Sequence, residues 1–390
     1  MHAFTRFSRF TDTLSGTTMF GDAGGPGFGI GGYGGVSTGA NDSLAAGMDI
    51  AINPKLLMDW RIGYYRYNVI DHKYDQSVQF ANQLGIPGIN MGDTFTSGAP
   101  GFDVADADRA GNQGTNNPTG GGAQYGSGLN INRCNCPLTE REDQGQIVTN
   151  LTRIMGNHSF KFGMDLRYAR NLRVPSDTDR TGLLHFAPGP TSDGGSAGGL
   201  GMATFMLGDV TSFGRYVSVS TNAKEFQERD FCYAQGTWHP TPSLTVNYGL
   251  RYEMYFPESV NGKGNGSLME LNGGTGGYQT TGYMQVAGYG NVPSNMGWNP
   301  NTNGWNPRVG IAWSPDQKTV IRAGYGRSFD IGVFGSIFGH VVTQNLPVLA
   351  NQSVSAATTT GTAFTLAAGP PAFQFPTVPG NGLLPSPGYN

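Results

Sequence analysis

The residues most capable of chemistry in this sequence are charged side chains placed at every second position of otherwise apolar segments. Asp165 and Arg167 are separated by one leucine, and Arg251 and Glu253 are separated by one tyrosine. Residues two apart in an extended chain lie on the same face of a strand. The spacing therefore predicts a charged surface that pairs internally or meets a polar solute, and it does not predict a catalytic centre.

The other reactive residue types lack the spacing of a catalytic or metal site. The six histidines are scattered, and none stands at metal-ligand spacing from another. Cys134 and Cys136 lie two apart in a polar loop. We expect them to be loop residues that can form a disulfide with each other if the protein is exported, and not metal ligands. We therefore expect no enzyme activity, no metal and no cofactor. A faint calcium-loop pattern misses the required carboxylate spacing; it comprises Asp103, Asp106, Asp108 and Gly111.

The composition favours a β protein whose outer surface does not meet water. Only 13% of the residues are charged while 11% are aromatic and 62 are glycine, and an aromatic content of this size argues against a disordered polar chain. A net charge of −3 leaves no basic surplus for nucleic acid, so we expect no nucleic-acid partner. No stretch approaches the ~20 continuous apolar residues that a membrane-spanning helix requires.

Alternation of apolar and polar residues predicts antiparallel strands instead. In the clearest segment, 243–256, every second residue is apolar over the whole run, and this period of two is typical of a β-strand. The same pattern is clear at 159–171. The ten predicted strands cover residues 1–10, 43–52, 55–68, 144–155, 159–171, 211–220, 226–238, 243–256, 305–314 and 319–329.

The connections between these strands alternate between tight turns and very long loops. Long loops argue against a compact soluble domain, whereas this asymmetry is expected of an outer-membrane barrel. We therefore predict one all-β domain over residues 1–390: an antiparallel transmembrane β-barrel in the bacterial outer membrane, partial, with roughly 10–11 strands of a larger barrel and long extracellular loops. The alternative is a β-sandwich. The predicted long loops cover 70–143, 172–202, 257–304 and 330–390.

In such a barrel, the two faces of each strand meet different surroundings. The polar faces are predicted to point into the lumen, and the simpler interpretation of their charges is cross-strand ion pairs that stabilise the wall. The predicted lumen-facing residues are Asp49, Arg61, Asp165, Arg167, Arg251, Glu253, Arg308 and Arg322. Aromatic residues near the strand ends predict two interfacial girdles, with Trp60, Tyr168, Trp238, Tyr252, Phe256, Trp313 and Tyr325.

Several segments resemble TonB-dependent outer-membrane receptors, in particular the Oar-like group. The segment GNHSFKFG at 156–163 is similar to a hairpin of that group. The ordered set spans most of the chain and is more specific than any single piece. The other segments that fit the same barrel lie at 84–89, 237–253, 306–312 and 319–326.

This resemblance implies uptake of a bulky nutrient such as an oligosaccharide or a peptide. Long extracellular loops would capture the substrate, and an energy-coupled plug would then rearrange. The implied partners are outer-membrane lipid, the substrate, and the TonB energy-coupling complex acting through a plug domain absent here. The group also carries a signal peptide, an amino-terminal β-sandwich, a plug and a barrel of about 22 strands. We therefore expect this chain to be a truncated middle of the barrel that aggregates in isolation through its open edges.

Two other classes of protein fit parts of the same pattern. A passive porin would use the same strands without a plug. A secreted glycine-rich β adhesin would instead form a soluble sandwich or solenoid, and cell fractionation separates that case because an adhesin would not require detergent for extraction.

Overall fold

The described part of the chain consists mainly of long strands. Cys134 and Cys136 lie outside it, as do Asp106, Asp108 and Gly111 of the calcium-like pattern. The computed structural model describes residues 1–18, 27–28, 35–105, 123–125, 138–173, 180–195, 197–218, 220–270, 282–297, 302–329, 342–343 and 345–385.

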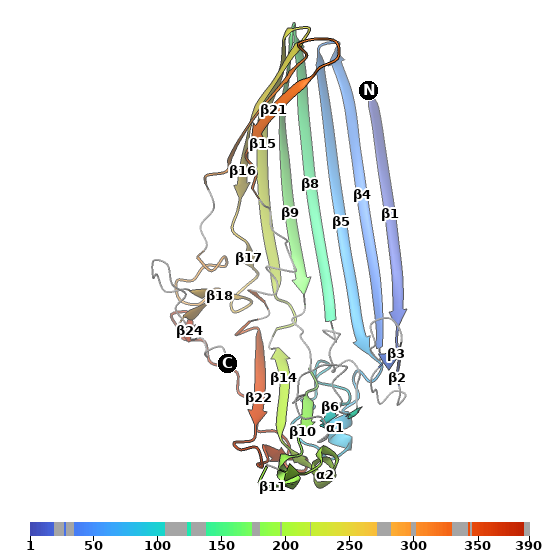
Figure 1. Cartoon of the computed structure of the whole chain (residues 1–390), viewed down its shortest axis with the longest axis vertical. Helices are drawn as coiled ribbons and strands as arrows, with labels where there is room; N and C mark the ends of the chain where they lie inside the picture. Colours follow the sequence, from blue (N-terminus) through green and yellow to red (C-terminus); the bar gives the residue numbers. More distant parts are fainter. Residues whose placement is uncertain are drawn as a thin grey trace.

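One antiparallel sheet of ten strands, which we call the wall, dominates the structure (Figure 1). The order is β1-β4-β5-β8-β9-β15-β16-β20-β21, and β17 pairs with β15. The sheet is open, since β1 and β21 each have one neighbour among the described strands. Its strands are β1 (His2–Ser15), β4 (Gly35–Asn53), β5 (Leu56–Lys73), β8 (Leu138–Met155), β9 (His158–Arg173), β15 (Lys224–Thr241), β16 (Leu244–Tyr255), β17 (Ser259–Val260), β20 (Trp305–Trp313) and β21 (Ile321–Gly326).

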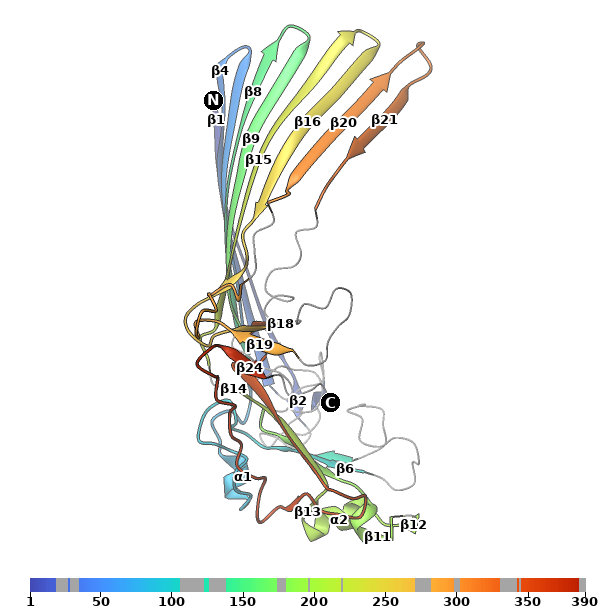
Figure 2. The same cartoon turned by 90° about the vertical axis from the view of Figure 1, so that its left-hand side faces the viewer.

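The tight turns of the wall gather at one end, which we call the turn end (Figure 2). They join β4 to β5, β8 to β9, β15 to β16 and β20 to β21. In the first turn the Asn53 side chain accepts a hydrogen bond from the Lys55 backbone N–H at 3.0 Å. Gly156, in the second, has a φ of 55°, a left-handed conformation that glycine adopts without steric cost. The turn residues expected from the sequence therefore close the hairpins.

The wall strands are longer than a bilayer requires. β5, β8 and β15 each have 18 residues, whereas about 9–11 residues cross a bilayer as a tilted strand. The hairpins are also staggered, because Leu56 at the start of β5 lies opposite Arg153 and not opposite the last residue of β8. Stagger of this kind accompanies strand tilt in barrels.

The predicted strands agree with the wall in all but one case. Nine of the ten overlap wall strands, most of which are longer than predicted. The prediction of a wall strand at 211–220 is wrong, because β14 (Ser212–Ser218) pairs with β22 (Leu349–Ser355) and β10 (Leu183–Phe186) in a separate sheet. Its exposed and buried residues do alternate, but its buried face packs against other loop segments and not along the wall.

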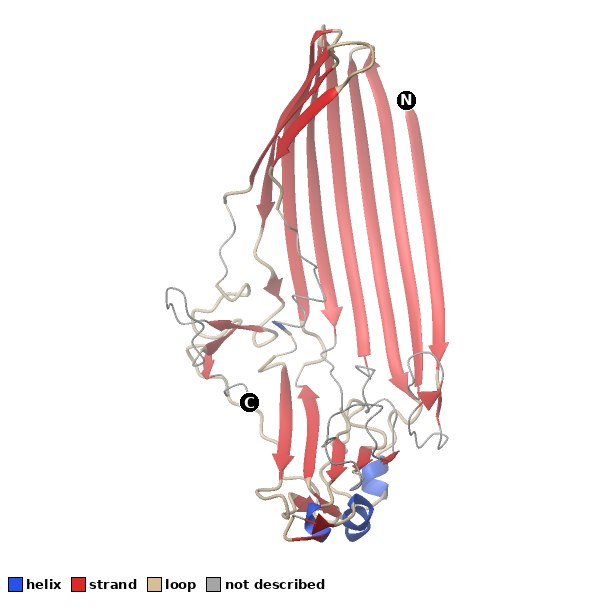
Figure 3. Ribbon diagram, in the orientation of Figure 1, coloured by secondary structure: helices blue, strands red, loops and turns tan. Residues whose placement is uncertain are grey.

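The predicted long loops fold, and we call their folded part the loop assembly. It lies at the end of the wall opposite the turns, where the short helices also gather (Figure 3). No helix among the described residues is long and apolar enough to cross a membrane. The largest sheet of the assembly has the order β22-β14-β10-β6-β7. The remaining elements are β6 (Gly101–Val104), β7 (Ala123–Tyr125), α1 (Phe80–Gln83), α2 (Gly201–Leu207), η2 (Gly189–Thr191), and the small sheets of β2 (Thr17–Thr18) with β3 (Gly27–Phe28), β11 (Ser192–Asp193) with β12 (Ala197–Gly198), β13 (Asp209–Val210) with β23 (Phe364–Thr365), and β18 (Ser267–Glu270) with β19 (Tyr283–Val286) and β24 (Leu383–Pro385).

The main hydrophobic core of the described chain lies in this assembly and not in the wall. Phe186 and Phe213 are fully or almost fully buried there, and the ring of Phe186 packs edge-on against Phe205 at 5.1 Å. Ile86 and Ile89, from the segment 84–89, belong to the same core. The rest of the cluster comprises Ala81, Val104, Leu184 and Val210.

Candidate functional site

The register of the wall separates its side chains into two faces. Residues directly opposite each other on antiparallel strands point to the same side, and one such row runs from Asp49 through Asn150 and Tyr233 to Arg251. We call this side the polar face. It carries all eight residues that the sequence predicts for the lumen: Asp49, Arg61, Asp165, Arg167, Arg251, Glu253, Arg308 and Arg322.

The opposite side, which we call the apolar face, is exposed. The side chains of Phe162 and Val309 are each 46% exposed there, and Tyr325 is 66% exposed. Six of the seven predicted girdle aromatics lie on this face: Trp60, Tyr168, Trp238, Tyr252, Trp313 and Tyr325. Phe256 follows the end of β16, where its N–H bonds the Glu228 carbonyl at 3.2 Å. Division of these aromatics into two belts stays a prediction.

Four of the predicted charged residues assemble around one buried aromatic ring on the polar face. Phe231 lies opposite both Asp165 and Glu253 in the register, and only 3% of it is exposed. The Arg251 guanidinium stands over its ring at 4.5 Å and that of Arg167 at 5.4 Å. Cation–π contacts at this distance are favourable and hold guanidinium groups in fixed positions. We call these five residues the Phe231 cluster.

The carboxylates of the Phe231 cluster neutralise the arginines along each strand. Arg167 Nη2 donates to Asp165 Oδ2 at 2.7 Å, and Arg251 Nε donates to Glu253 Oε1 at 2.7 Å. Both pairs join residues two apart on one strand, so the cross-strand arrangement expected from the sequence is wrong for them. Asp49 and Arg61 do form a cross-strand pair, with Arg61 Nη2 and Asp49 Oδ1 separated by 2.6 Å.

Sequence reasoning missed three members of this network. Phe231 itself is one. Gln146 donates to Asp165 Oδ1 at 2.8 Å, and Tyr255 donates its hydroxyl proton to Glu253 Oε2 at 2.8 Å. These residues could have been grouped only by knowing which residues lie opposite one another on neighbouring strands. That requires the register of the sheet, which the sequence alone does not give.

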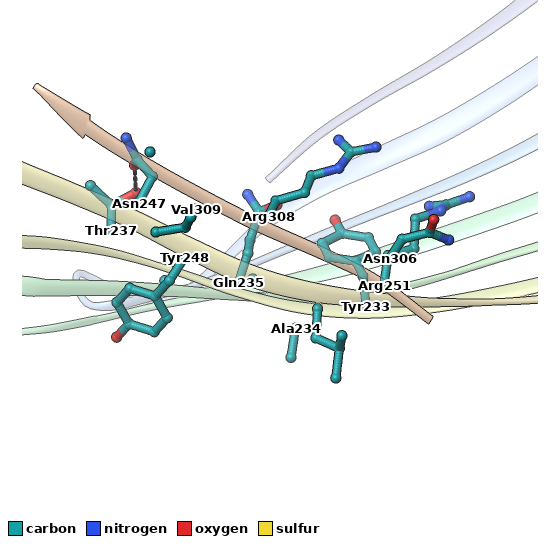
Figure 4. A pocket seen from close by; sticks show the side chains of 14 residues that line it. Tyr233, Ala234, Gln235, Thr237, Asn247, Tyr248, Arg251, Asn306, Arg308 and Val309 are labelled. Atoms are coloured by element: carbon teal, nitrogen blue, oxygen red, sulfur yellow. Dashed lines mark hydrogen bonds between the residues drawn. The ribbon is translucent and has the colours of Figure 1, made fainter. Parts of the chain in front are cut away.

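A groove of about 470 Å³ lies beside the Phe231 cluster, over β15, β16 and β20 (Figure 4). Tyr233, Gln235, Arg251 and Arg308 project to one side of the sheet there, whereas Tyr248 projects to the other. Position 249 is glycine on the polar face, where a side-chain carbon would come within 2.8 Å of Gln235 Cβ, so this glycine lets the Gln235 side chain lie close to β16.

The groove offers hydrogen-bond donors and acceptors without a catalytic arrangement. Among the described residues, neither Arg308 nor Arg322 pairs with a carboxylate, and no three described metal-ligating side chains come close enough to hold a metal. Amide, hydroxyl and guanidinium groups in an open groove can bind hydroxyl-rich or amide-rich solutes reversibly. The arrangement therefore supports binding of a polar solute.

One titratable group outside the spanning strands has a strongly altered environment. Glu258 lies between β16 and β17, where burial raises the pKa of its carboxyl to about 7 despite the nearby Arg229 guanidinium. The Gln227 side chain donates a hydrogen bond to Glu258 Oε1. The connection after β16 therefore carries a group that changes charge near neutral pH.

Comparison with known families supports the antiparallel β architecture described above. The profile of the outer membrane beta barrel domain matches residues 1–389. The chain belongs to this family. The family places it in the bacterial outer membrane, as the sequence predicts. The family also confirms the predicted all-β, antiparallel fold class. No curated protein matches the chain.

Proposed function

We propose that this outer-membrane barrel protein is the barrel region of a TonB-dependent receptor resembling the Oar-like group, and that it transports a bulky nutrient and catalyses no reaction. The family supports an outer-membrane transporter or porin-like role. The finer assignment rests on the resemblance of segments such as 156–163 and on the folded loops described above. Its partners would be an oligosaccharide or peptide substrate and the TonB energy-coupling complex, reached through a plug domain.

The orientation of the wall is part of this proposal. A charge facing hydrocarbon at mid-depth costs ~2–4 kcal/mol in a membrane barrel, so the polar face is assigned to the interior and the apolar face to lipid tails. The Phe231 cluster would then line the interior, together with the groove beside it. Its arginines suit contact with a plug or with a passing polar solute, because guanidinium groups form several hydrogen bonds in a fixed plane.

The observation that carries the receptor assignment is the loop assembly. A passive channel needs no structured surface beyond its constriction, whereas a receptor must hold a substrate in one geometry before transport. Segments that connect or follow the wall strands form a five-stranded sheet, and a cluster of buried hydrophobic residues packs against it. Arg215, on β14, donates through Nη1 to the Ile89 carbonyl at 2.6 Å and so joins two separate loops. This construction gives a rigid surface at the predicted extracellular end.

Energy dependence of uptake tests the receptor proposal against the porin. Cells that express the complete gene would be given a labelled oligosaccharide mixture and, separately, a labelled peptide mixture. We expect accumulation of one class, with loss of that accumulation when the proton gradient is collapsed. Accumulation that persists after collapse would indicate a passive porin and overturn the assignment.

A variant pair tests the role of the polar face in the same assay. The double substitution D165N/R167Q removes one ion pair of the Phe231 cluster and the Arg167 guanidinium over the Phe231 ring, and leaves neutral polar side chains in their place. We expect slower uptake at an unchanged amount of folded protein. The control is Thr152→Ser on the same face toward the turn end, which should transport normally. Equal uptake by all three proteins would show that the Phe231 cluster does not line the substrate path.

A further inference from the structure

The apolar face of the wall ends, on the side of the loop assembly, in a row of alternating charges. The row crosses five neighbouring strands in perfect register. Each member lies directly opposite the next, so unlike charges face each other across every strand pair. From β1 to β9 the row reads Arg9, Asp42, Arg66, Asp143 and Arg170.

Three arginines of this region converge on one carboxylate. Asp143 accepts hydrogen bonds from Arg66 Nε at 2.6 Å, from Arg170 Nη2 at 2.6 Å and from Arg141 Nε at 3.2 Å. The side chain of Asp143 is 11% exposed, whereas those of the arginines are 37–39% exposed. One carboxylate thus orients three guanidinium groups and neutralises only one of them. We call these four residues the Asp143 cluster.

The Asp143 cluster stands at the depth where a bilayer should end. Arg66 follows Leu56, at the start of β5, by ten positions. Arg170 follows Phe160, the third residue of β9, by ten positions, and Leu56 and Phe160 both lie opposite Arg153. Because ~9–11 residues of a tilted strand span the hydrocarbon, the cluster lies at the headgroups on the loop side. Long loops are extracellular in such barrels, so these are headgroups of the outer leaflet.

An apolar groove of about 410 Å³ opens directly below the Asp143 cluster on the same face. Its floor is Gly145, which lies between Tyr64 and Tyr168 in the register. A side-chain carbon added at Gly145 would meet nothing within 4 Å, so the space between the two rings is open. Ile62 and Ile147, which lie opposite each other, continue the groove toward the turn end. Its mainly apolar lining suits a hydrocarbon chain.

We propose that this face binds one phosphorylated glycolipid of the outer leaflet. An acyl chain lies over Gly145 between the two tyrosines, and a headgroup phosphate accepts hydrogen bonds from Arg66, Arg141 and Arg170. Planar guanidinium groups suit phosphate oxygens. The inference depends on the placement of the chain in the outer membrane and not on any transport function.

Two acidic residues set where the phosphate can lie. Glu228 and Asp230 line the β15 side of the groove, with Glu228 opposite Tyr168 in the register. They repel a phosphate from that side, so it is held over β5, β8 and β9 where the arginines stand. Two further acids lie on this face beside the site. Asp143 is surrounded by the three arginines, and Asp42 lies opposite Arg66 with its Oδ1 3.7 Å from Arg9 Nε.

Lipid titration of the protein expressed from its complete gene and purified in detergent micelles, followed by native mass spectrometry, tests the site. The probes are bisphosphorylated lipid A, its fully dephosphorylated form, phosphatidylglycerol and inorganic phosphate. We expect one bisphosphorylated lipid A to bind about tenfold more tightly than the dephosphorylated form, since two or more charge-assisted hydrogen bonds are lost in the latter. Inorganic phosphate alone should not bind measurably.

Two variants separate the headgroup site from the groove. R141Q/R170Q leaves Arg66 to pair with Asp143, so the wall should fold, and we expect about a tenfold loss for bisphosphorylated lipid A with no change for the dephosphorylated form. Gly145→Leu fills the groove and should weaken both lipid A forms. The control Arg153→Gln alters an exposed arginine of the same face at the turn end and should bind as the parent does.

Three results would each overturn the proposal. One is equal binding of the two lipid A forms to the parent chain, which means unspecific lipid contact. Another is parent-like binding by R141Q/R170Q with the fold intact by circular dichroism. The third is displacement of bound lipid A by millimolar inorganic phosphate, because the site would then recognise phosphate without the acyl chain.

Discussion

The wall and the loop assembly differ in where their large apolar side chains lie. On the apolar face of the wall large apolar residues such as Phe162 and Leu250 are exposed. In the loop assembly residues of the same types point inward, and Leu184 and Phe186 are completely buried. The wall is held by continuous backbone pairing between neighbouring strands, whereas the assembly depends on a packed core. The two regions of this chain therefore suit different surroundings, lipid for the apolar face of the wall and water for the loop assembly.

This difference teaches that the stability of each region has a separate physical origin. With the apolar face toward lipid tails, as proposed above, lipid or detergent fills the space that a smaller residue on that face would leave. The loop assembly is surrounded by water, and a smaller residue in its core leaves a cavity that nothing fills. The two regions should therefore respond differently to the same substitution.

A matched pair of phenylalanine substitutions gives the largest expected effect. Phe186→Ala should destabilise the loop assembly by about 3–5 kcal/mol, because it removes a fully buried ring and leaves a cavity. Phe162→Ala on the apolar face lacks the cavity penalty and should leave the assembly folded. Hydrogen exchange over residues 180–218 measures the difference. Loss of the assembly in both variants, or loss of the wall in Phe186→Ala, would mean that the regions are not independent.

An arginine placed on either face of the wall gives the next largest effect. Leu250→Arg puts a charge at the middle of the apolar face of β16 and should cost ~2–4 kcal/mol of folding free energy in a bilayer. Gln235→Arg puts the same charge on the polar face of the neighbouring strand β15 and should cost far less. Urea titration of vesicle-inserted protein measures both. Equal costs on the two faces would show that the apolar face does not meet lipid.

The sequence predicts the wall well because its signal is local. Nine of the ten predicted strands overlap wall strands, since a period of two and a tight turn can be recognised within a dozen residues. The loop assembly was not predicted. Its sheet joins β6, β10, β14 and β22, which are far apart in the chain, and β6 pairs with β10 in parallel. Such pairings leave no short-range pattern, which is also why 211–220 was placed in the wall.

The candidate site also has a part that the sequence predicts and a part that it does not. Asp165 and Arg167, or Arg251 and Glu253, are recognisable as same-face pairs from their spacing alone. That both pairs share Phe231 depends on the register of β9, β15 and β16, which the sequence does not specify. The Asp143 cluster was missed for the opposite reason. Its charges occupy the face that is apolar nearer the turns, so strand alternation alone offered no reason to group them.

A smaller effect is expected from the pH response of the connection after β16. Burial raises the pKa of Glu258 from 4.5 to about 7, so the folded state binds more protons than the unfolded state between these values. The stability contributed is complete below pH 4.5 and is lost as the pH rises through 7. Hydrogen exchange over 256–261, corrected for intrinsic rates, should therefore be faster at pH 8 than at pH 5, by about 1 kcal/mol of local stability once solvent screening is allowed for.

Two variants check the origin of that response. Glu258→Gln should remove the difference between pH 5 and pH 8. Asp316→Asn, in the turn after β20, should leave the difference unchanged. The Lys318 backbone N–H donates to the Asp316 carboxylate and holds the pKa of that carboxyl below its usual value. Asp316 therefore stabilises the fold in its charged form, and this stability is lost only at acidic pH. A pH dependence that survives in Glu258→Gln must come from another group.

The smallest expected effect concerns the ion pair between Asp49 and Arg61 on the polar face. Its side chains are 50% and 35% exposed, so water screens their attraction, and exposed pairs contribute ~0.2–1 kcal/mol. A double-mutant cycle with D49N and R61Q should give a coupling free energy in this range that falls further in 1 M salt. The matched cycle uses D165N and R167Q. The Asp165 carboxylate is mostly buried, so the ion pair between Asp165 and Arg167 should give a larger coupling free energy. If the exposed pair coupled as strongly as the buried one, the polar face near β4 would be as shielded from water as the Phe231 cluster.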